Sequence, residues 1–118
     1  MIYFSSYGKV KDLRKFITRF YSISIGNGGY GFKKIRAFVP DWDLVKDFKK
    51  NIISWKEYEA FYYMDMVENL KGKEEIIKDW CKKNDGVCLL CFESNDRFCH
   101  RRIVREYLQS LGIACAEA

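Results

Sequence analysis

Residues 87–102, with the sequence VCLLCFESNDRFCHRR, gather the side chains of this chain that are best suited to chemistry. They include three cysteines, a glutamate, three arginines and the only histidine of the 118 residues. A short apolar run comes first, and a polar stretch follows it. These residue types suit a zinc centre, a cysteine nucleophile or an anion-binding turn. They also fit a buried strand followed by an ordinary helix.

A zinc centre would use Cys88, Cys91, Cys99 and His100. Zinc sites favour Cys-x-x-Cys pairs at a tight turn, where both sulfurs point at one ion. Cys88 and Cys91 lie instead in an apolar run, and residues three apart in a strand point to opposite faces of the sheet. We therefore expect no metal and no cofactor, and we interpret Cys88 as a small buried side chain.

A cysteine nucleophile has two candidates. Cys91 and Arg97 have the spacing of cysteine-based phosphatases, but acidic side chains within that loop would repel a phosphate. Cys99 is the better candidate, because it opens a helix beside the basic segment 100–102. A helix amino terminus and neighbouring cations both lower the pKa of a thiol.

An anion-binding turn is the third interpretation. Unpaired N–H groups at a helix amino terminus attract phosphate or carboxylate, and His100, Arg101 and Arg102 would add donors there. A basic first turn opposes the helix dipole, which favours an anion at this place. The alternative is a salt bridge from Glu93 to Arg101 or Arg102 that only braces the turn. The sequence leaves both interpretations open.

Hydrophobic periodicity and turn residues divide the chain into alternating strands and helices. We expect strands at 2–6, 21–25, 87–92 and 113–116, and helices at 9–20, 41–50, 54–70, 73–84 and 98–111. Such alternation predicts a small α/β fold, a single domain over residues 1–118 with a mostly parallel sheet of about four strands flanked by helices.

This fold predicts where a ligand binds, because open α/β sheets bind ligands beyond the carboxyl ends of their strands. Residues 93–101 follow one such end. Ser6 ends the first strand, so we expect it to line the same crevice. The glycine-rich segment 26–32 is predicted to be a loop that covers the pocket.

Composition narrows the class of protein. The net charge of +5 permits contact with phosphates, although both signs are mixed along the chain. We expect no membrane partner, because no apolar run approaches the roughly 20 residues that span a bilayer. The amino terminus does not resemble a signal peptide, which predicts a cytoplasmic protein whose five cysteines form no structural disulfide.

The segment LLCFESNDRFCHRRIV resembles the signature of the domain of unknown function 488 family (DUF488), a strand ending in Cys-x-Glu and then Cys-His-Arg opening a helix. YFSSYGKV, YSISI, AFVPDWDLV and ISWKEYEAFYYMDMV extend the resemblance along most of the chain. It implies a compact α/β fold and no agreed activity. Arg97 and Cys88 are not part of the pattern, and segment 26–31 departs from it. The resemblance assigns the candidate site to Cys91, Glu93, Cys99, His100 and Arg101, with Tyr58 and Tyr62 as weaker matches.

We therefore expect a pocket that binds an anionic ligand: a nucleotide, a modified base or a nucleic-acid phosphate. If the protein is catalytic, Glu93 or His100 is the acid/base group and Cys99 is a supporting or nucleophilic thiol. The ligand contacts are expected from Arg101, Arg102, Ser6 and Tyr62. The alternative is a non-catalytic module that binds nucleic acid or protein and in which the Glu93–Arg101 pair is structural.

Overall fold

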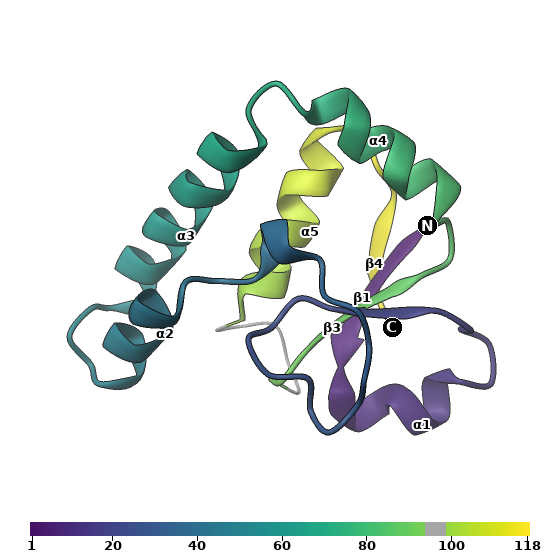
Figure 1. The fold of residues 1–118 in the computed structure, drawn as a ribbon, viewed down its shortest axis with the longest axis horizontal. Helices are drawn as coiled ribbons and strands as arrows, with labels where there is room; N and C mark the ends of the chain where they lie inside the picture. The colour runs from purple at the N-terminus through teal and green to yellow at the C-terminus, as the bar shows by residue number, and fades with distance from the viewer. Residues whose placement is uncertain (94–98) are drawn as a thin grey trace.

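Four parallel strands form the sheet in the computed structural model, which describes residues 1–93 and 99–118 (Figure 1). The strands are β1 (Ile2–Ser6), β2 (Phe20–Ser22), β3 (Cys88–Cys91) and β4 (Cys115–Glu117), in the order β2-β3-β1-β4. β1 and β3 lie at the centre, where their apolar side chains are covered on both faces. The expected small α/β fold with a parallel sheet is confirmed.

Helices cover both faces of the sheet. α5 packs against β3 and β4, and α3 packs against α5 on the side away from the sheet (Figure 1). The opposite face is covered by α1, whose Val10 and Leu13 belong to the same core cluster as Cys88 and Leu90. The helical segments are η1 (Tyr7–Lys9), α1 (Val10–Leu13), η2 (Arg36–Phe38), α2 (Trp42–Lys49), α3 (Trp55–Leu70), α4 (Glu74–Lys83) and α5 (His100–Ser110).

The alternation of side chains along β3 separates its two cysteines. Cys88 packs with the α1 side of the core, and Cys91 packs with the α3–α5 side. The expected divergence of these sulfurs is confirmed, so they do not share one site.

The first predicted helix is the largest departure from expectation. The spacing of apolar residues predicts a helix over 9–20, but α1 ends at Leu13 and Phe16 is 71% exposed. Phe20 instead begins β2 and pairs with Cys88. The sheet therefore overrides the helical pattern, because pairing with the buried β3 requires an extended backbone at Phe20.

The amino terminus of α3 carries a capping box. Ser54 Oγ accepts a hydrogen bond from the Glu57 N–H at 3.1 Å, and the Glu57 carboxylate accepts one from the Ser54 N–H at 3.0 Å. This cap fixes the start of the helix, and the buried face then repeats every four residues at Tyr58, Tyr62, Met66 and Leu70. Phe61 and Asp65, between these positions, are exposed.

Replacing Ser54 with alanine is expected to lower the free energy of unfolding by about 1 kcal/mol, because the N–H groups that open α3 lose their acceptor. Urea unfolding followed by circular dichroism measures this change. Thr18→Ala is the matched control: Thr18 is exposed and lies outside helices and strands. An equal loss in both variants contradicts the capping role.

Within the part of the chain that the structure describes, no helix has the length and apolar character needed to cross a membrane.

Candidate functional site

A pocket of about 330 Å³ lies beyond the carboxyl ends of β2 and β3. Its wall comes from the residues after these two strands, from α2, and from the starts of α3 and α5. This is the edge of the sheet at which open α/β folds bind ligands. The lining residues are Ser24, Ile25, Gly26, Pro40, Trp42, Val45, Phe48, Lys49, Trp55, Tyr58, Phe92, Glu93 and His100.

Aromatic side chains from α2 and α3 form one wall of the pocket. Trp55 stacks on Tyr58 with ring centroids 5.1 Å apart and an interplanar angle of 18°. Phe48 meets the edge of Trp55 at 5.5 Å. Because the capping box starts α3 at Trp55, it also determines that Trp55 and Tyr58 face the pocket one turn apart.

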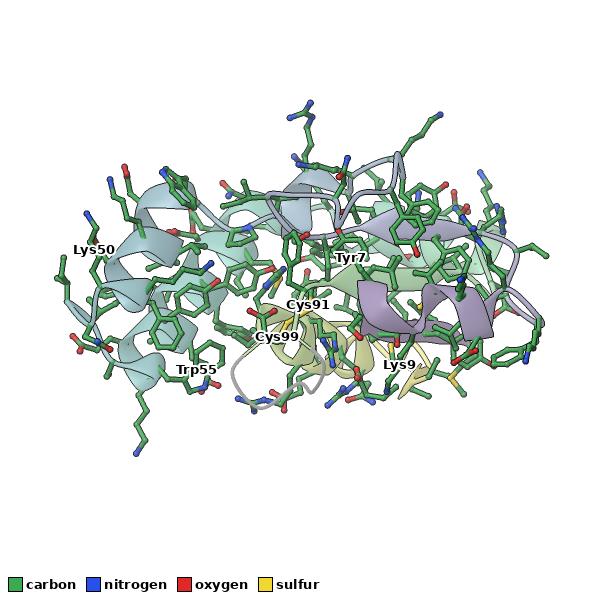
Figure 2. All side chains as sticks on the ribbon, turned by 90° about the horizontal axis from the view of Figure 1, so that it is seen from below. Tyr7, Lys9, Lys50, Trp55, Cys91 and Cys99 are labelled. Carbon is green, nitrogen blue, oxygen red and sulfur yellow. A yellow bond between two sulfur atoms is a disulfide. The ribbon has the colours of Figure 1, made fainter. Side chains whose placement is uncertain are left out.

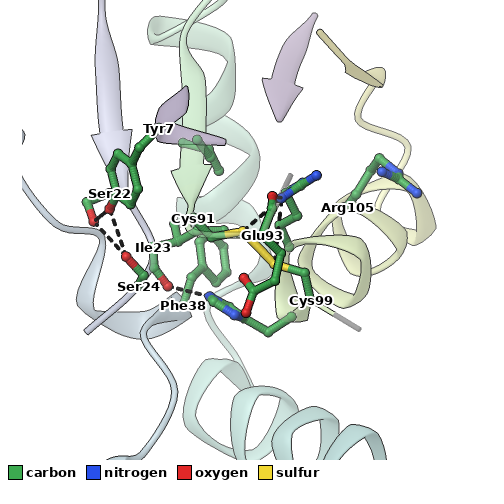
Figure 3. Close-up of a disulfide and its surroundings, with 12 residues drawn as sticks. Tyr7, Ser22, Ile23, Ser24, Phe38, Cys91, Glu93, Cys99 and Arg105 are labelled. Atoms are coloured by element: carbon green, nitrogen blue, oxygen red, sulfur yellow. Dashed lines mark hydrogen bonds between the residues drawn. A yellow bond between two sulfur atoms is a disulfide. The ribbon is translucent and has the colours of Figure 1, made fainter. Parts of the chain in front are cut away.

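Glu93 contributes a carboxylate to the pocket. It follows Cys91 by two residues, and its side chain lies beside the Cys91–Cys99 disulfide (Figure 3). Burial raises the pKa of the Tyr58 hydroxyl well above its usual value, and the negative charge of Glu93 makes a smaller contribution in the same direction. Tyr58 is therefore a neutral hydroxyl next to a carboxylate.

His100 is buried at the start of α5, with its ring edge-on to Tyr62. Its Nε2 hydrogen-bonds to the carbonyl oxygen of Ile23, which only accepts, so Nε2 carries the proton and Nδ1 is an acceptor. Burial is the main cause that lowers the pKa of His100 to about 4; the hydrogen bond to Ile23 opposes this shift, and the nearby Arg101 charge adds to it. His100 is neutral at pH 7.

Arg101 is 1% exposed and does not line the pocket. Its Nε donates to both carboxylate oxygens of Glu117, at 3.1 and 3.3 Å. Its Nη1 donates to Cys91 Sγ at 3.0 Å and to the backbone oxygen of Glu93. This burial does not support the predicted anion clamp, because the guanidinium is already occupied within the protein.

The alternative interpretation, a salt bridge between the side chains of Glu93 and Arg101, is not what the structure shows either. Among the described residues, the carboxylate partner of Arg101 is Glu117, on β4. Sequence inspection missed Glu117 because it lies 16 residues away, in the edge strand that returns beside β1. Arg101 holds only the backbone of Glu93, so the Glu93 carboxylate remains at the pocket.

The other predicted ligand contacts lie outside the pocket lining. Arg102 pairs with Glu59 and Glu106 on the surface. Ser6 is buried next to Cys91 in the β1–β3 pair. Tyr62 is buried, and its hydroxyl donates to the Phe38 carbonyl at 2.7 Å. Arg97, the residue of the phosphatase spacing, lies outside the described residues.

Cys91 and Cys99 form a disulfide, where free cysteines and no structural disulfide were expected (Figure 2, Figure 3). β3 ends at Cys91 and α5 begins directly after Cys99, so the fold returns the two sulfurs to the same place. The expectation relied on cellular compartment and took no account of this geometry. The two sulfurs and a Glu93 carboxylate oxygen lie within 4.8 Å of one another, a different set from the zinc ligands considered above.

A buried polar network supports the rim after β2. The Tyr7 hydroxyl shares hydrogen bonds with Ser22 Oγ and Ser24 Oγ (Figure 3). It also donates to the Gly26 carbonyl. A Cβ atom on Gly26 would lie 2.8 Å from the Phe92 ring. Glycine at this position therefore allows the loop to approach Phe92 and close one side of the pocket.

The aromatic wall is the part of the site that sequence inspection missed. Trp42 and Phe48 were assigned to a helix without a role in binding. Exposure is the signal that distinguishes Trp42, since this large apolar side chain is 54% exposed at the pocket. The sequence does not reveal that exposure.

Comparison with known proteins identifies a family. The family model DUF488-N3a, described as the active DUF488-N3 subclade, matches residues 12–112. No curated protein and no solved structure matches the chain.

Proposed function

Because the chain belongs to the DUF488 family, whose name specifies no reaction, we propose a function from the chemistry of the pocket: the protein binds a nucleotide or a modified base. The observation that carries this proposal is the combination of an aromatic wall with the Glu93 carboxylate. Planar heterocycles stack on such walls, typically for about 1–3 kcal/mol per base. The pocket volume of about 330 Å³ also lies within the usual range of small-molecule sites.

The position of the charges favours a base over a small inorganic anion. Glu93 would repel a phosphate placed next to it, but it accepts hydrogen bonds from the N–H groups of a heterocycle. Lys49 lies at the end of α2 and is exposed where it lines the pocket. The ring of the ligand therefore lies against the aromatic side chains. Its phosphate lies near Lys49.

Acid/base catalysis is part of this proposal, and Glu93 is the group assigned to it. His100 is a weak base, because its pKa is about 4, and it serves better as a fixed hydrogen-bond acceptor through Nδ1. Cys99 has no free thiol while it is bonded to Cys91. The description of the matched subclade as active supports a catalytic role. A cytoplasmic location also remains part of the proposal.

Titration of the protein with nucleoside monophosphates, followed by tryptophan fluorescence, tests this function, since Trp42 and Trp55 line the pocket. Glu93→Gln is expected to raise the Kd at least tenfold, because a hydrogen bond to a charged group contributes about 1.5–3 kcal/mol. Glu68→Gln, an exposed change on α3, is the matched control and should bind normally.

The same titration with short oligonucleotides distinguishes a nucleic-acid phosphate from a free nucleotide. Tighter binding of the oligonucleotide, still dependent on Glu93, assigns the ligand to nucleic acid. Unchanged affinity in Glu93→Gln, or no saturable binding of any of these compounds, refutes the proposed site.

A further inference from the structure

The Cys91–Cys99 disulfide joins the two segments that bring Glu93 and His100 to the pocket. Cys91 is the last residue of β3, and Cys99 is the N-cap of α5. Both cysteines are buried. In a reducing compartment a disulfide is usually transient and has a catalytic or sensing role. The surroundings of the pair therefore decide whether this bond is structural or reactive.

A cation lies against the two sulfurs. Arg101 Nη1 is 3.0 Å from Cys91 Sγ and 3.8 Å from Cys99 Sγ. The amino terminus of α5 adds a partial positive charge at Cys99. Both features stabilise a thiolate over a thiol, and the thiolate is the form that reacts with oxidants and disulfides.

The other cysteines have the opposite environment. Burial raises the pKa of Cys88 to about 12 and that of Cys81 to about 11. Burial likewise raises the pKa of Cys115 to about 11. These thiols stay protonated near neutral pH, so reactivity is concentrated in one pair.

We propose that Cys91 and Cys99 form a reversible dithiol–disulfide site that hydroperoxides oxidise and dithiols reduce, and that its state sets the position of Glu93 at the pocket. The proposal adds a site of oxidative modification to the binding site described above. The effect of the redox state on ligand affinity rests on the proposed function. The thiol chemistry of Cys91 and Cys99 does not.

The oxidation balances as a two-electron reaction. The thiolate of one cysteine attacks the hydroperoxide, forming an S–O bond and breaking the O–O bond, and the alcohol leaves with a proton. The second cysteine attacks the resulting sulfenic acid, forming the S–S bond, and water leaves with a proton. A dithiol reverses the result through a mixed disulfide and is itself oxidised to a disulfide.

The coupling to the pocket runs through Arg101. One nitrogen, Nη1, donates both to Cys91 Sγ and to the backbone oxygen of Glu93. Phe92, between them in the chain, lines the pocket and packs edge-on against Tyr7 at 5.0 Å. Reduction removes the bond to α5 and places a thiolate beside Nη1. The guanidinium then has a stronger partner in the thiolate, which loosens its hold on Glu93.

Thiol counting by mass spectrometry tests the site. Reduced protein should carry five alkylatable thiols after mild unfolding, and three after treatment with hydrogen peroxide, with a Cys91–Cys99 cross-linked peptide. Cys99→Ser should abolish this cross-link, and Cys115→Ser should retain it. Hydrogen exchange of peptides containing Phe92 and Glu93 should be faster in the reduced wild type than in the oxidised one.

Three results overturn the proposal. The first is that five thiols survive peroxide, and the second is that oxidation leaves exchange near Glu93 unchanged. The third is that reduced protein retains a stoichiometric metal ion on Cys91, Glu93 and Cys99 that protects both thiols. Nucleotide affinity is measured separately in both forms and should differ about tenfold. If neither form binds nucleotide while the cross-link and the exchange change as expected, the redox site is upheld and the nucleotide function fails.

Discussion

Acidification from pH 7 to pH 5 is expected to lower the free energy of unfolding by about 2 kcal/mol through His100 alone. The pKa of this side chain is about 4 in the folded protein, against 6.5 in an unfolded chain. Between these values the unfolded state binds the proton and the folded state does not, so stability falls as the pH falls. The full loss, reached near pH 4, is about 3 kcal/mol.

The surroundings of His100 explain why the fold keeps it neutral. A proton on Nδ1 would place a positive charge in a buried position next to the Arg101 guanidinium. Tyr62 packs against the ring and offers no negative charge. Glu93 lines the same pocket, but its negative charge does not reverse the lowering of the His100 pKa by burial.

Urea unfolding at several pH values measures this dependence, and His100→Gln is its control. Glutamine has an amide donor that can replace the bond to Ile23, and it does not titrate. Because His100 is the only histidine, the variant should be flat between pH 7 and 5.5, above the range where carboxylates titrate. A wild-type protein that is equally flat there contradicts a buried neutral imidazole.

Arg101→Met is expected to lower the free energy of unfolding by about 3 kcal/mol, the lower end of the cost of breaking a buried ion pair. Methionine retains much of the volume but none of the donors. The Glu93 carbonyl and Cys91 Sγ then lose their partner. Glu117 is less affected, because it is partly exposed and still accepts a hydrogen bond from Arg105 at 2.7 Å.

The neighbouring arginine provides a control on the same helix. Arg102 is partly exposed and pairs with Glu59 and Glu106, so Arg102→Met should cost less than about 1 kcal/mol. Urea unfolding of both variants at pH 7 gives the comparison. Equal losses would show that Arg101 contributes no more than a surface ion pair.

The sequence predicts the site's location better than its contacts. Cys-x-Glu after a buried strand and Cys-His-Arg at a helix start place Glu93 and His100 at one edge of the sheet, and the structure brings both to the pocket. The contacts of the Arg101 side chain were not predictable. The side chain points toward Glu117, which lies in a strand whose position the sequence does not specify. The disulfide was missed for the same reason, since it depends on how closely β3 and α5 approach.

The aromatic wall shows a second limit. The period of four in Tyr58, Tyr62 and Met66 identifies the buried face of α3. It does not show that Trp55 and Tyr58, at the open end of that face, also meet a pocket. Aromatic residues suit a buried core and a ligand pocket equally well. The position of α2 decides which of these two environments Trp55 and Tyr58 meet.

The strand order has a consequence for how the chain is made. β1 is synthesised before both of its neighbours, β3 and β4, which end at Cys91 and Glu117. Its hydrogen-bonding edges therefore stay unpaired until more than 80 further residues have followed it. Pairing between such distant segments is slow, and exposed strands of incomplete chains are prone to aggregate. The nascent protein should depend on chaperones until β3 emerges.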